Sequence, residues 1–249
     1  MVSKKSITPF FSIITCTRNS SKYLSKCLDS VRSQTFTDYE HIVIDGQSTD
    51  STRKILTKYS KKIISSPPRG IANAMNIGLK NATGKYIYFL NSDDSFYDKG
   101  VLQKVHNFLL ANPDLEWVFG HIHETDGLNT IGFPPRRKIF QGKHPNILKF
   151  YNYIPHQATF MQKSVFEKYG GFDEKLKSMM DPEYWLRVAR VTNWGYMPIT
   201  VANYLIRPDS QSENLINAPS NTSEYETVQS KYLNKLELII AKIINNALR

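Results

Sequence analysis

The stretch that decides the fold is Lys85-Tyr86-Ile87-Tyr88-Phe89-Leu90-Asn91-Ser92-Asp93-Asp94. Its apolar and aromatic run follows a glycine and ends in a polar cluster, a pattern typical of a buried β-strand. In an open α/β sheet, such a strand places the residues that follow it at the carboxyl edge, where ligands bind. Here those residues include two adjacent acids, Asp93 and Asp94, which repel each other unless a cation or hydrogen-bond donors compensate them. The stretch therefore predicts a ligand site at the end of this strand.

Two interpretations of the acid pair are open at this point. Carboxylate oxygens with no cysteine nearby suit Mg²⁺ or Mn²⁺ better than Zn²⁺. The alternative is that Asp93 and Asp94 only begin a turn, or cap the helix that starts near Asp98. A Ser-Asp-Asp triplet taken alone favours this structural role, whereas the rest of the sequence favours the metal.

The 249-residue chain has the composition of an ordinary globular protein, with 41% hydrophobic and 22% charged residues. This length buries a sizeable core, as one domain or as two closely joined halves. No apolar run approaches the roughly 20 residues that a membrane-spanning helix requires. The N-terminal segment has no signal-peptide cleavage site, and the two cysteines, Cys16 and Cys27, form no metal motif. We therefore expect a cytoplasmic protein in a reducing compartment.

The net charge of +10 implies anionic partners. No recognisable nucleic-acid motif accompanies the basic residues. We therefore expect the partners to be phosphorylated small molecules or acidic lipid head groups, and we expect no binding of nucleic acid.

Strand and helix patterns alternate along the first hundred residues. Strands are predicted over 10–17, 39–45, 62–65 and the acid-bearing run, and helices over 22–34, 50–59 and 71–81. This alternation is typical of a mostly parallel, doubly wound α/β sheet flanked by helices. Because parallel strands end at one edge of a sheet, we expect four loops to meet there, with these polar residues: Thr17, Arg18 and Asn19; Asp45; Arg69; and the acid pair. Neither a GxGxxG nor a GxxxxGK[ST] motif is present.

The second half of the chain is less regular. Helices are predicted over 99–111, 146–151 and 164–169 and from Asp181 onward, and strands over 116–121 and 194–206. Residues 125–143, rich in glycine, proline and basic residues, predict a mobile loop or an irregular hairpin over the edge where the four loops meet.

Three blocks carry a family resemblance: FSIITCTRN…LSKCLDSVRSQTF…EHIVIDGQSTDST within residues 11–52, PPRGIANAMNIGLKNATGKYIYFLNSDD over 67–94, and GGFDEKLKSMMDPEYWLR over 170–187. In this order they resemble family 2 glycosyltransferases, which have the GT-A fold, over roughly residues 9–210. The resemblance implies a GT-A domain over 1–213, with a nucleotide-sugar half (1–98) and an acceptor half (99–213). A C-terminal helical tail (214–249) follows.

The resemblance also implies roles for individual residues. Asp94 matches the direct metal ligand for Mn²⁺ or Mg²⁺, Asp93 matches the acid that contacts the ribose and the metal shell, and Asp181 matches the catalytic base. Two departures are that Ser92 replaces the usual first acid of the DxD motif, and that Met180 replaces an acid before the base. Donor binding is implied for Thr15, Thr17, Arg18, Asn19, Asp45, Arg69, Gly70 and Asn73.

Structural alternatives stand beside these roles. Asp181 is also placed to cap its helix, with Pro182 at the first helical position. Asp45 is also suited to cap a turn, and Arg69 to be a solvated charge, but the position of Asp45 at the end of a buried strand and of Arg69 in a rigid turn favours binding. A contact with the acceptor or the outer metal shell is a hypothesis for His156, Gln157 and Trp185, with a structural role for the histidine and core packing for the tryptophan as the alternatives.

These features together predict a metal-dependent, inverting, non-processive glycosyltransferase. It would move one sugar from a nucleotide sugar, with a UDP-sugar preferred, to a glycan or lipid-linked acceptor in surface-polysaccharide biosynthesis, as for O-antigen, lipopolysaccharide or capsule. One base and no enzyme nucleophile imply direct displacement, and the lack of a QxxRW motif argues against a processive synthase. A nucleotidyltransferase and a non-catalytic nucleotide-sugar or glycan-binding protein of the same fold are the alternatives.

Residues 228–249 predict one basic amphipathic helix, with an apolar face formed by Leu233, Leu236, Ile240, Ile243 and Ile244. Such a helix binds anionic lipid at the membrane interface, which would place the enzyme on the inner face of the cytoplasmic membrane. The alternative is that this face packs on the body of the protein or on a second subunit of a homodimer. A lipid-linked acceptor, as the resemblance implies, favours the membrane.

Overall fold

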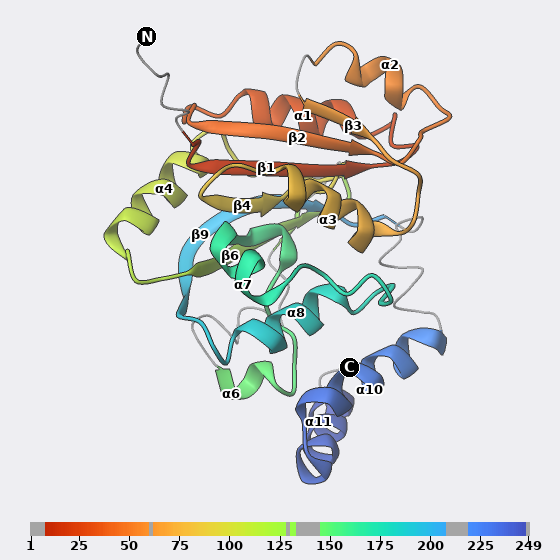
Figure 1. The fold of residues 1–249 in the computed structure, drawn as a ribbon, viewed down its shortest axis with the longest axis vertical. Helices are drawn as coiled ribbons and strands as arrows, with labels where there is room; N and C mark the ends of the chain where they lie inside the picture. The colour runs from red at the N-terminus through yellow and green to blue at the C-terminus, as the bar shows by residue number, and fades with distance from the viewer. Residues whose placement is uncertain (1–7, 60–61, 128–129, 133–144, 208–218, 248–249) are drawn as a thin grey trace.

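A computed structural model describes residues 8–59, 62–127, 130–132, 145–207 and 219–247. Within these residues, nine strands form one sheet in the order β3-β2-β1-β4-β8-β6-β9-β5, with β7 beside β6. Helices lie on both faces of the sheet, and two further helices near the C-terminus lie outside it (Figure 1). This α/β architecture confirms the fold class predicted from the sequence.

The first half of the sheet is parallel. Its strands are β1 (Phe11–Thr17), β2 (Tyr39–Asp45), β3 (Lys62–Ser65) and β4 (Tyr86–Phe89), and its helices are α1 (Leu24–Arg32), α2 (Thr52–Leu56) and α3 (Ile71–Asn81). Thr17 pairs with Asp45, and Asp45 pairs with Ser65, so the three outer strands end at one edge. All seven residues of β1 are buried, as expected for a strand covered on both faces.

Gly84 allows the acid-bearing strand to lie close to β1. A Cβ atom on Gly84 would be 2.6 Å from the backbone of Phe11 and Ser12. The Gly84 N–H donates to Ser12 Oγ at 2.8 Å. Glycine is therefore required at position 84, because a side chain there would clash with the backbone of β1.

The second half of the sheet is mixed in direction. It contains β5 (Ser95–Phe96), β6 (Trp117–Thr125), β7 (Thr130–Gly132), β8 (Thr159–Gln162) and β9 (Trp194–Leu205). β8 is antiparallel to both β4 and β6, β9 is parallel to β6, and β5 is antiparallel to β9. The helices are α4 (Val101–Ala111), α6 (Pro145–Leu148), the 3₁₀ helix η1 (His156–Ala158), α7 (Lys163–Tyr169) and α8 (Met180–Val188). In the segment predicted as a loop or hairpin over 125–143, β7 pairs antiparallel with β6, and residues 128–129 and 133–143 lie outside the described part.

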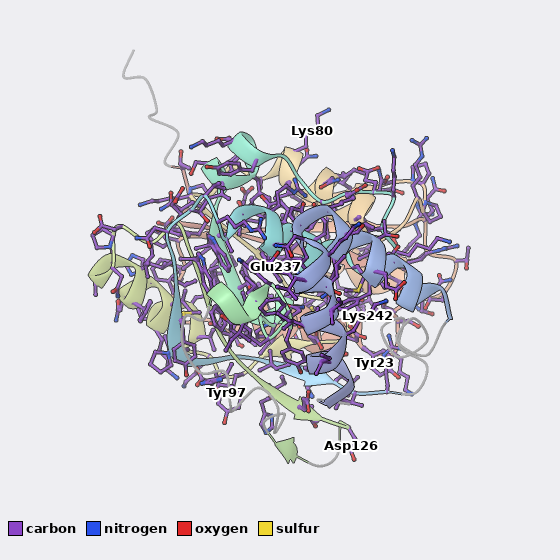
Figure 2. The ribbon with its side chains drawn as sticks, turned by 90° about the horizontal axis from the view of Figure 1, so that it is seen from below. Tyr23, Lys80, Tyr97, Asp126, Glu237 and Lys242 are labelled. Atoms are coloured by element: carbon purple, nitrogen blue, oxygen red, sulfur yellow. The ribbon has the colours of Figure 1, made fainter. Side chains whose placement is uncertain are left out.

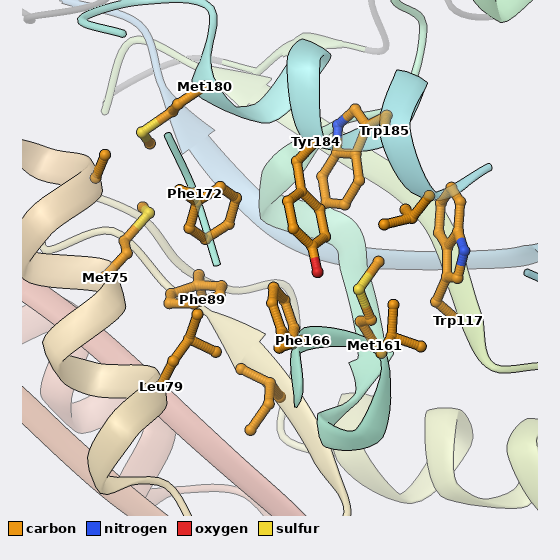
Figure 3. Close-up of a cluster of buried hydrophobic side chains, with 14 of the residues drawn as sticks. Met75, Leu79, Phe89, Trp117, Met161, Phe166, Phe172, Met180, Tyr184 and Trp185 are labelled. Atoms are coloured by element: carbon orange, nitrogen blue, oxygen red, sulfur yellow. The ribbon is translucent and has the colours of Figure 1, made fainter. Parts of the chain in front are cut away.

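Aromatic packing fixes α8 against the sheet. The ring of Trp117 on β6 stacks on Trp185 of α8, with centroids 5.5 Å apart, and on Trp194 of β9 at 4.8 Å. Tyr184 of α8 stacks on Phe166 of α7 at 5.0 Å. Figure 3 shows Phe89 of β4 between this pair of rings and the side chains of Met75 and Leu79 on α3. Burying such side chains contributes roughly 1.5–3 kcal/mol each, so the body of α8 has a defined position.

The tail forms two helices, α10 (Pro219–Tyr232) and α11 (Lys235–Ala247), and not the single helix predicted over 228–249. The Asn234 Oδ1 accepts from the Glu237 N–H at 3.0 Å, and the Glu237 carboxylate accepts from the Asn234 N–H at 2.9 Å. This reciprocal pair is a capping box, which begins a new helix after Leu233. Figure 2 shows both tail helices lying over the body of the protein. None of the described helices combines the length and apolar character needed to cross a membrane.

Candidate active site

Hydrogen bonds connect three of the four loops that the sequence predicts at the carboxyl edge of the parallel strands. The Asn19 N–H donates to Ser48 Oγ at 2.9 Å, and Asn19 Oδ1 accepts from the Thr49 N–H at 2.8 Å. The Ser92 hydroxyl donates to Ser20 Oγ at 2.9 Å. The loops after β1, β2 and β4 are therefore connected by direct hydrogen bonds, and the side-chain oxygen of Asn19 is used in this connection.

The two threonines of β1 differ in their surroundings. Thr15 is fully buried, and its Oγ1 lies 3.0 Å from His41 Nε2. Thr17, at the end of the strand, is 5% exposed, and its hydroxyl has no hydrogen-bond partner among the described residues. Because a buried hydroxyl without a partner is costly, Thr17 is the one of the pair better placed to contact a ligand. Donor binding by both threonines stays a prediction.

Asp45 lies at the end of β2, and partners contact both of its carboxylate oxygens. Oδ1 accepts from the hydroxyl of Ser48 at 2.6 Å and from its N–H at 3.2 Å, and Oδ2 lies 3.5 Å from Arg53 Nε. The bonds to Ser48 show that Asp45 caps the turn after β2, which was the structural alternative to donor binding. Beside it, the exposed Arg18 packs its aliphatic stem against Gly46, where a Cβ atom would lie 3.3 Å from Arg18 Cβ.

The acid pair has a dense set of partners. Asp94 is 2% exposed; its Oδ1 accepts from the Leu205 N–H at 3.0 Å, and its Oδ2 accepts from Asn91 Nδ2 at 3.2 Å. Asp93 Oδ2 accepts from Arg207 Nε at 3.0 Å and from Nη2 at 2.9 Å. Burial, and then the charge of Asp93, raise the pKa of Asp94 well above its usual range, against the opposing effect of its hydrogen bonds and Arg207. The ionised form of Asp94 is therefore unfavourable here unless a further positive charge, such as a cation, compensates it.

Arg207 is a residue of this site that the sequence analysis missed. Its guanidinium carbon lies 4.8 Å from the centroid of the Tyr23 ring, in addition to the contact with Asp93. The antiparallel pairing of β5 with β9 brings it there, because Ser95 lies opposite Asn203. The sequence signal was an arginine directly after a predicted strand, but the neighbour of that strand was not predictable.

The chemistry of the acid pair fits a hard divalent cation. Among the described residues, no group of three or more His, Cys, Asp or Glu side chains is arranged to hold a metal. Asp93 and Asp94 offer only oxygen atoms and excess negative charge. Mg²⁺ and similar ions bind through one or two carboxylates and complete their coordination with phosphate oxygens and water. The donor set thus suits a metal that binds together with a diphosphate.

The first turns of α3 are hydrogen-bonded to the loop before α8. Gly70 has φ of +105°, which favours glycine, and Arg69 before it is exposed. Asn73 Nδ2 donates to Glu174 Oε2 at 2.9 Å, and Asn76 Nδ2 donates to Glu174 Oε1 at 2.9 Å. These bonds lower the pKa of Glu174, and the charge of Arg69 lowers it further. The amide of Asn73 therefore contacts the loop before α8, while its predicted contact with the donor stays a prediction.

Asp181 is the second residue of α8, and it is half-buried. The N-cap position belongs to Met179, so the alternative that Asp181 caps this helix with Pro182 at the first position is wrong. In Figure 1, the loop before α8 extends toward the side on which the arrows of β1 and β2 end. Asp181 thus lies in the first turn of a helix whose start faces the edge that carries the acid pair.

The remaining predicted residues are His156 and Gln157 of η1 and Trp185 of α8. The ring centroid of His156 lies 5.5 Å from that of Phe89 and 6.3 Å from that of Trp185. Burial lowers the pKa of His156 to about 4, so the imidazole is neutral at neutral pH. Neither its ring nitrogens nor Trp185 Nε1 has a partner within the described residues. The carbonyl of Gln157 accepts from the Tyr88 hydroxyl at 2.9 Å. The core position of Trp185 is a structural role, and contact of any of the three with the acceptor stays a prediction.

Relatives of known sequence share much of the chain. A "PGL/p-HBAD biosynthesis glycosyltransferase" of Mycobacterium tuberculosis is 31% identical over 79% of this chain and 77% of its own length. An uncharacterized glycosyltransferase of Rickettsia typhi is 29% identical over 94% of this chain and 76% of its own length.

Solved structures of the same fold cover most of the chain. S. aureus TarS 1–349 in complex with UDP-GlcNAc aligns with a TM-score of 0.69 at 19% identity, over 90% of this chain and 71% of that one. The mannosyltransferase PcManGT from Pyrobaculum calidifontis, in complex with GDP-Man and Mn²⁺, aligns with a TM-score of 0.69 at 17% identity, over 95% and 70%. The chain spans 43% of a longer TarS structure.

The family model described as "Glycosyl transferase family 2" matches residues 12–170, which include all of β1 except its first residue, the loops of the carboxyl edge and the acid pair. This match and the curated relatives agree with the mixed α/β sheet seen here. The protein is a glycosyltransferase of the GT-A fold, and the chain belongs to glycosyl transferase family 2.

Proposed function

We propose that the protein is a metal-dependent, inverting, non-processive glycosyltransferase that moves one sugar from a UDP-sugar to a hydroxyl group. The observation that carries the proposal is the buried acid pair at the end of β4, where Asp94 is 2% exposed beside Asp93. Asp181 at the start of α8 supplies the second requirement of the reaction, a carboxylate for proton transfer. The hydrogen bond between Asn73 and Glu174, which joins α3 to the loop before α8, supports a fixed position of α8 relative to the sheet.

The chemistry is a single displacement at the anomeric carbon. The acceptor oxygen forms a bond to this carbon while its proton passes to the carboxylate of Asp181. The bond between the carbon and the diphosphate oxygen breaks, and its electron pair leaves with the nucleoside diphosphate. Attack from the face opposite the leaving group inverts the configuration, and no covalent bond to the enzyme forms.

Asp94 and Asp93 are the residues that would hold Mn²⁺ or Mg²⁺ together with the diphosphate of the donor. When bound, the cation supplies positive charge that stabilises the leaving diphosphate. Two structural neighbours were solved with UDP-GlcNAc and with GDP-Man and Mn²⁺, so a donor panel should include both nucleotides.

We propose a glycan or lipid-linked acceptor in surface-polysaccharide biosynthesis, and a peripheral position on the inner face of the cytoplasmic membrane. Exposed apolar side chains along α11 support the membrane contact: Leu236 (67%), Ile239 (57%), Ile240 (37%) and Ile243 (64%). Their spacing places them on one side of the helix. Lys235 and Lys242 are exposed on the same helix and would attract anionic lipid. A homodimer through this face is the alternative outcome.

Release of nucleotide from a donor panel with Mn²⁺ tests the proposal. The panel contains UDP-GlcNAc, UDP-glucose, UDP-galactose and GDP-mannose, and water replaces the acceptor hydroxyl where no acceptor is known. Asp181→Asn keeps the size of the side chain but cannot accept the proton, so we expect turnover to fall about 100-fold or more with unchanged donor affinity. Asp114→Asn, a change at an exposed acid, is the matched control.

Three results would contradict parts of the proposal. Nucleotide binding without release from any donor would indicate a non-catalytic protein. Formation of a nucleotide sugar from a sugar phosphate and a nucleoside triphosphate would indicate a nucleotidyltransferase. Full activity of Asp181→Asn would place the base elsewhere; Glu183, the nearest acid in the sequence, is 4% exposed and already bonded to Arg187.

A further inference from the structure

Glu224 of α10 binds the start of α8. Its Oε1 accepts from the Lys177 N–H at 2.7 Å. Its Oε2 accepts from the Ser178 N–H at 2.8 Å, from the Ser178 hydroxyl at 2.6 Å and from the Met179 N–H at 3.0 Å. One carboxylate of the tail therefore satisfies four donors in the three residues that lead into α8.

One of these contacts reaches the N-cap residue of α8, Met179, and the other three hold the two residues that precede it. The first N–H groups of a helix have no partner within it, and Met179 at the N-cap position makes no side-chain hydrogen bond. A carboxylate near this end also interacts favourably with the helix dipole. Burial raises the pKa of Glu224, but the hydrogen bonds lower it below its usual value, so the side chain is ionised at neutral pH.

A second contact from the same helix fixes α8 farther along its axis. The Tyr232 hydroxyl donates to Glu183 Oε1, and Glu183 also accepts from Arg187 Nη2 at 2.7 Å. Arg190 Nη2 donates to the carbonyl of Tyr232 at 2.8 Å. Because α10 contacts both the start and the middle of α8, it restricts the position and the tilt of the helix that carries Asp181.

We propose that Glu224 is a positioning residue for catalysis: by fixing residues 177–179, it orients the carboxylate of Asp181 toward the acceptor hydroxyl. The inference rests on the proposed role of Asp181 as the base. α10 lies beyond residues 12–170 that match the family model, so that match assigns nothing to Glu224. Proton transfer requires hydrogen-bond distance, and a displacement of about 1 Å can lower a rate roughly 100-fold.

Two substitutions of Glu224 separate its effects. Glu224→Ala removes all four bonds, whereas Glu224→Gln can keep its oxygen at the position of Oε2, retain three bonds and lose only the bond from Lys177. The matched control is Glu226→Ala on the same helix, where the exposed side chain pairs only with the exposed Lys242 at 3.1 Å among the described residues.

The measurements are kcat for nucleotide release from the best donor of the panel with Mn²⁺, and the Kd of UDP with Mn²⁺ by calorimetry. We expect kcat to fall about 10- to 100-fold for Glu224→Ala and at least about threefold for Glu224→Gln, with the Kd of UDP unchanged in both. Glu226→Ala should match the wild type. A purely structural role would lower the melting temperature but leave kcat of the folded protein unchanged.

A double variant tests whether Glu224 acts through the base. If it does, Asp181→Asn with Glu224→Ala should be no slower than Asp181→Asn alone, because the group being positioned is already lost. If the fold-decreases in kcat of the two single variants multiply in the double variant, the proposal is overturned. A wild-type kcat in folded Glu224→Ala would overturn it as well. If circular dichroism shows that Glu224→Ala does not fold, wild-type kcat in Glu224→Gln overturns it instead. If Asp181→Asn is slow but both Glu224 variants are fully active, only this inference is refuted. If Asp181→Asn is itself fully active, the proposed base is refuted as well.

Discussion

Arg207 donates two hydrogen bonds to one carboxylate oxygen of Asp93, from Nε at 3.0 Å and from Nη2 at 2.9 Å. The two side chains are 22% and 20% exposed, so water screens the contact only in part. Asp94 lies next in the chain and is buried. The guanidinium of Arg207 therefore compensates part of the charge of the acid pair, and a metal ion at the pair would share that task.

Replacement of Arg207 by Ala should increase the stabilisation that Mn²⁺ gives in the absence of nucleotide. Without the guanidinium, the two carboxylates repel each other more strongly, and the folded protein gains more from a bound cation. Melting temperatures in EDTA and in Mn²⁺ measure this: we expect a lower value in EDTA than for the wild type and a larger rise with Mn²⁺. Arg53→Ala, at an exposed arginine 3.5 Å from Asp45, is the control. Equal rises in Arg207→Ala and the wild type would show that the guanidinium and the metal do not share a site.

Asp94→Asn should separate stability from activity. The asparagine can still accept from the Leu205 N–H, but it carries no charge for a metal. We expect Mn²⁺-stimulated turnover to fall about 100-fold or more, because the diphosphate loses its cation. The free energy of unfolding in EDTA should be no lower than that of the wild type, since a buried charge beside Asp93 has been removed. Unchanged Mn²⁺-dependent affinity for UDP by calorimetry would refute the metal role of Asp94.

His156 predicts an acid-dependent loss of stability. Its pKa is about 4 in the folded protein and about 6.5 in an unfolded chain, so below about pH 6.5 the unfolded state binds the additional proton. Stability therefore falls as the pH decreases from about 6.5 toward 4. Between pH 7 and 5 the wild type should lose about 2 kcal/mol more than His156→Gln does. Urea denaturation of both proteins at the two pH values measures this difference, and equal losses would mean that His156 does not cause it.

The parallel half of the fold could be predicted because its signals are local. β1 is a continuous run of buried residues, and α1 buries residues at helical spacing. The convergence of the loops follows from the parallel direction of the strands alone. The order of the remaining strands could not be predicted, because β8 inserts antiparallel between β4 and β6, and no local pattern encodes such long-range pairing.

The parts of the site that were missed depend on the same long-range pairing. Arg207 and the Leu205 N–H reach the acid pair only because β9 returns beside β5. Glu224 reaches α8 from a tail that the family blocks do not include. The break between α10 and α11 could have been predicted, because an asparagine followed three residues later by a glutamate is a helix-start signal. The apolar periodicity of residues 228–249 favoured one continuous helix instead.

The exposed apolar side of α11 predicts binding to anionic membranes. The predicted apolar face is only partly correct: Leu233 is 7% exposed and packs on the protein, whereas Leu236 and Ile243 are exposed. Ala241 is fully buried, and Glu237 pairs with Lys149 at 3.3 Å, so α11 packs on the body and leaves its apolar side outward. The side chain of Ile244 lies outside the described part.

The test replaces Leu236 and Ile243 with Glu, which removes apolar area and adds repulsion from anionic lipid. We expect co-sedimentation with phosphatidylglycerol-containing vesicles to weaken at least about tenfold, with UDP affinity unchanged. Leu110→Glu, at a residue of α4 that is 59% exposed, is the matched control. These substitutions are cleaner than truncation at 228, which would also remove the bond from Tyr232 to Glu183. Unchanged vesicle binding would reject the membrane contact, and loss of a dimer on sizing would assign this side of α11 to a second copy of the chain.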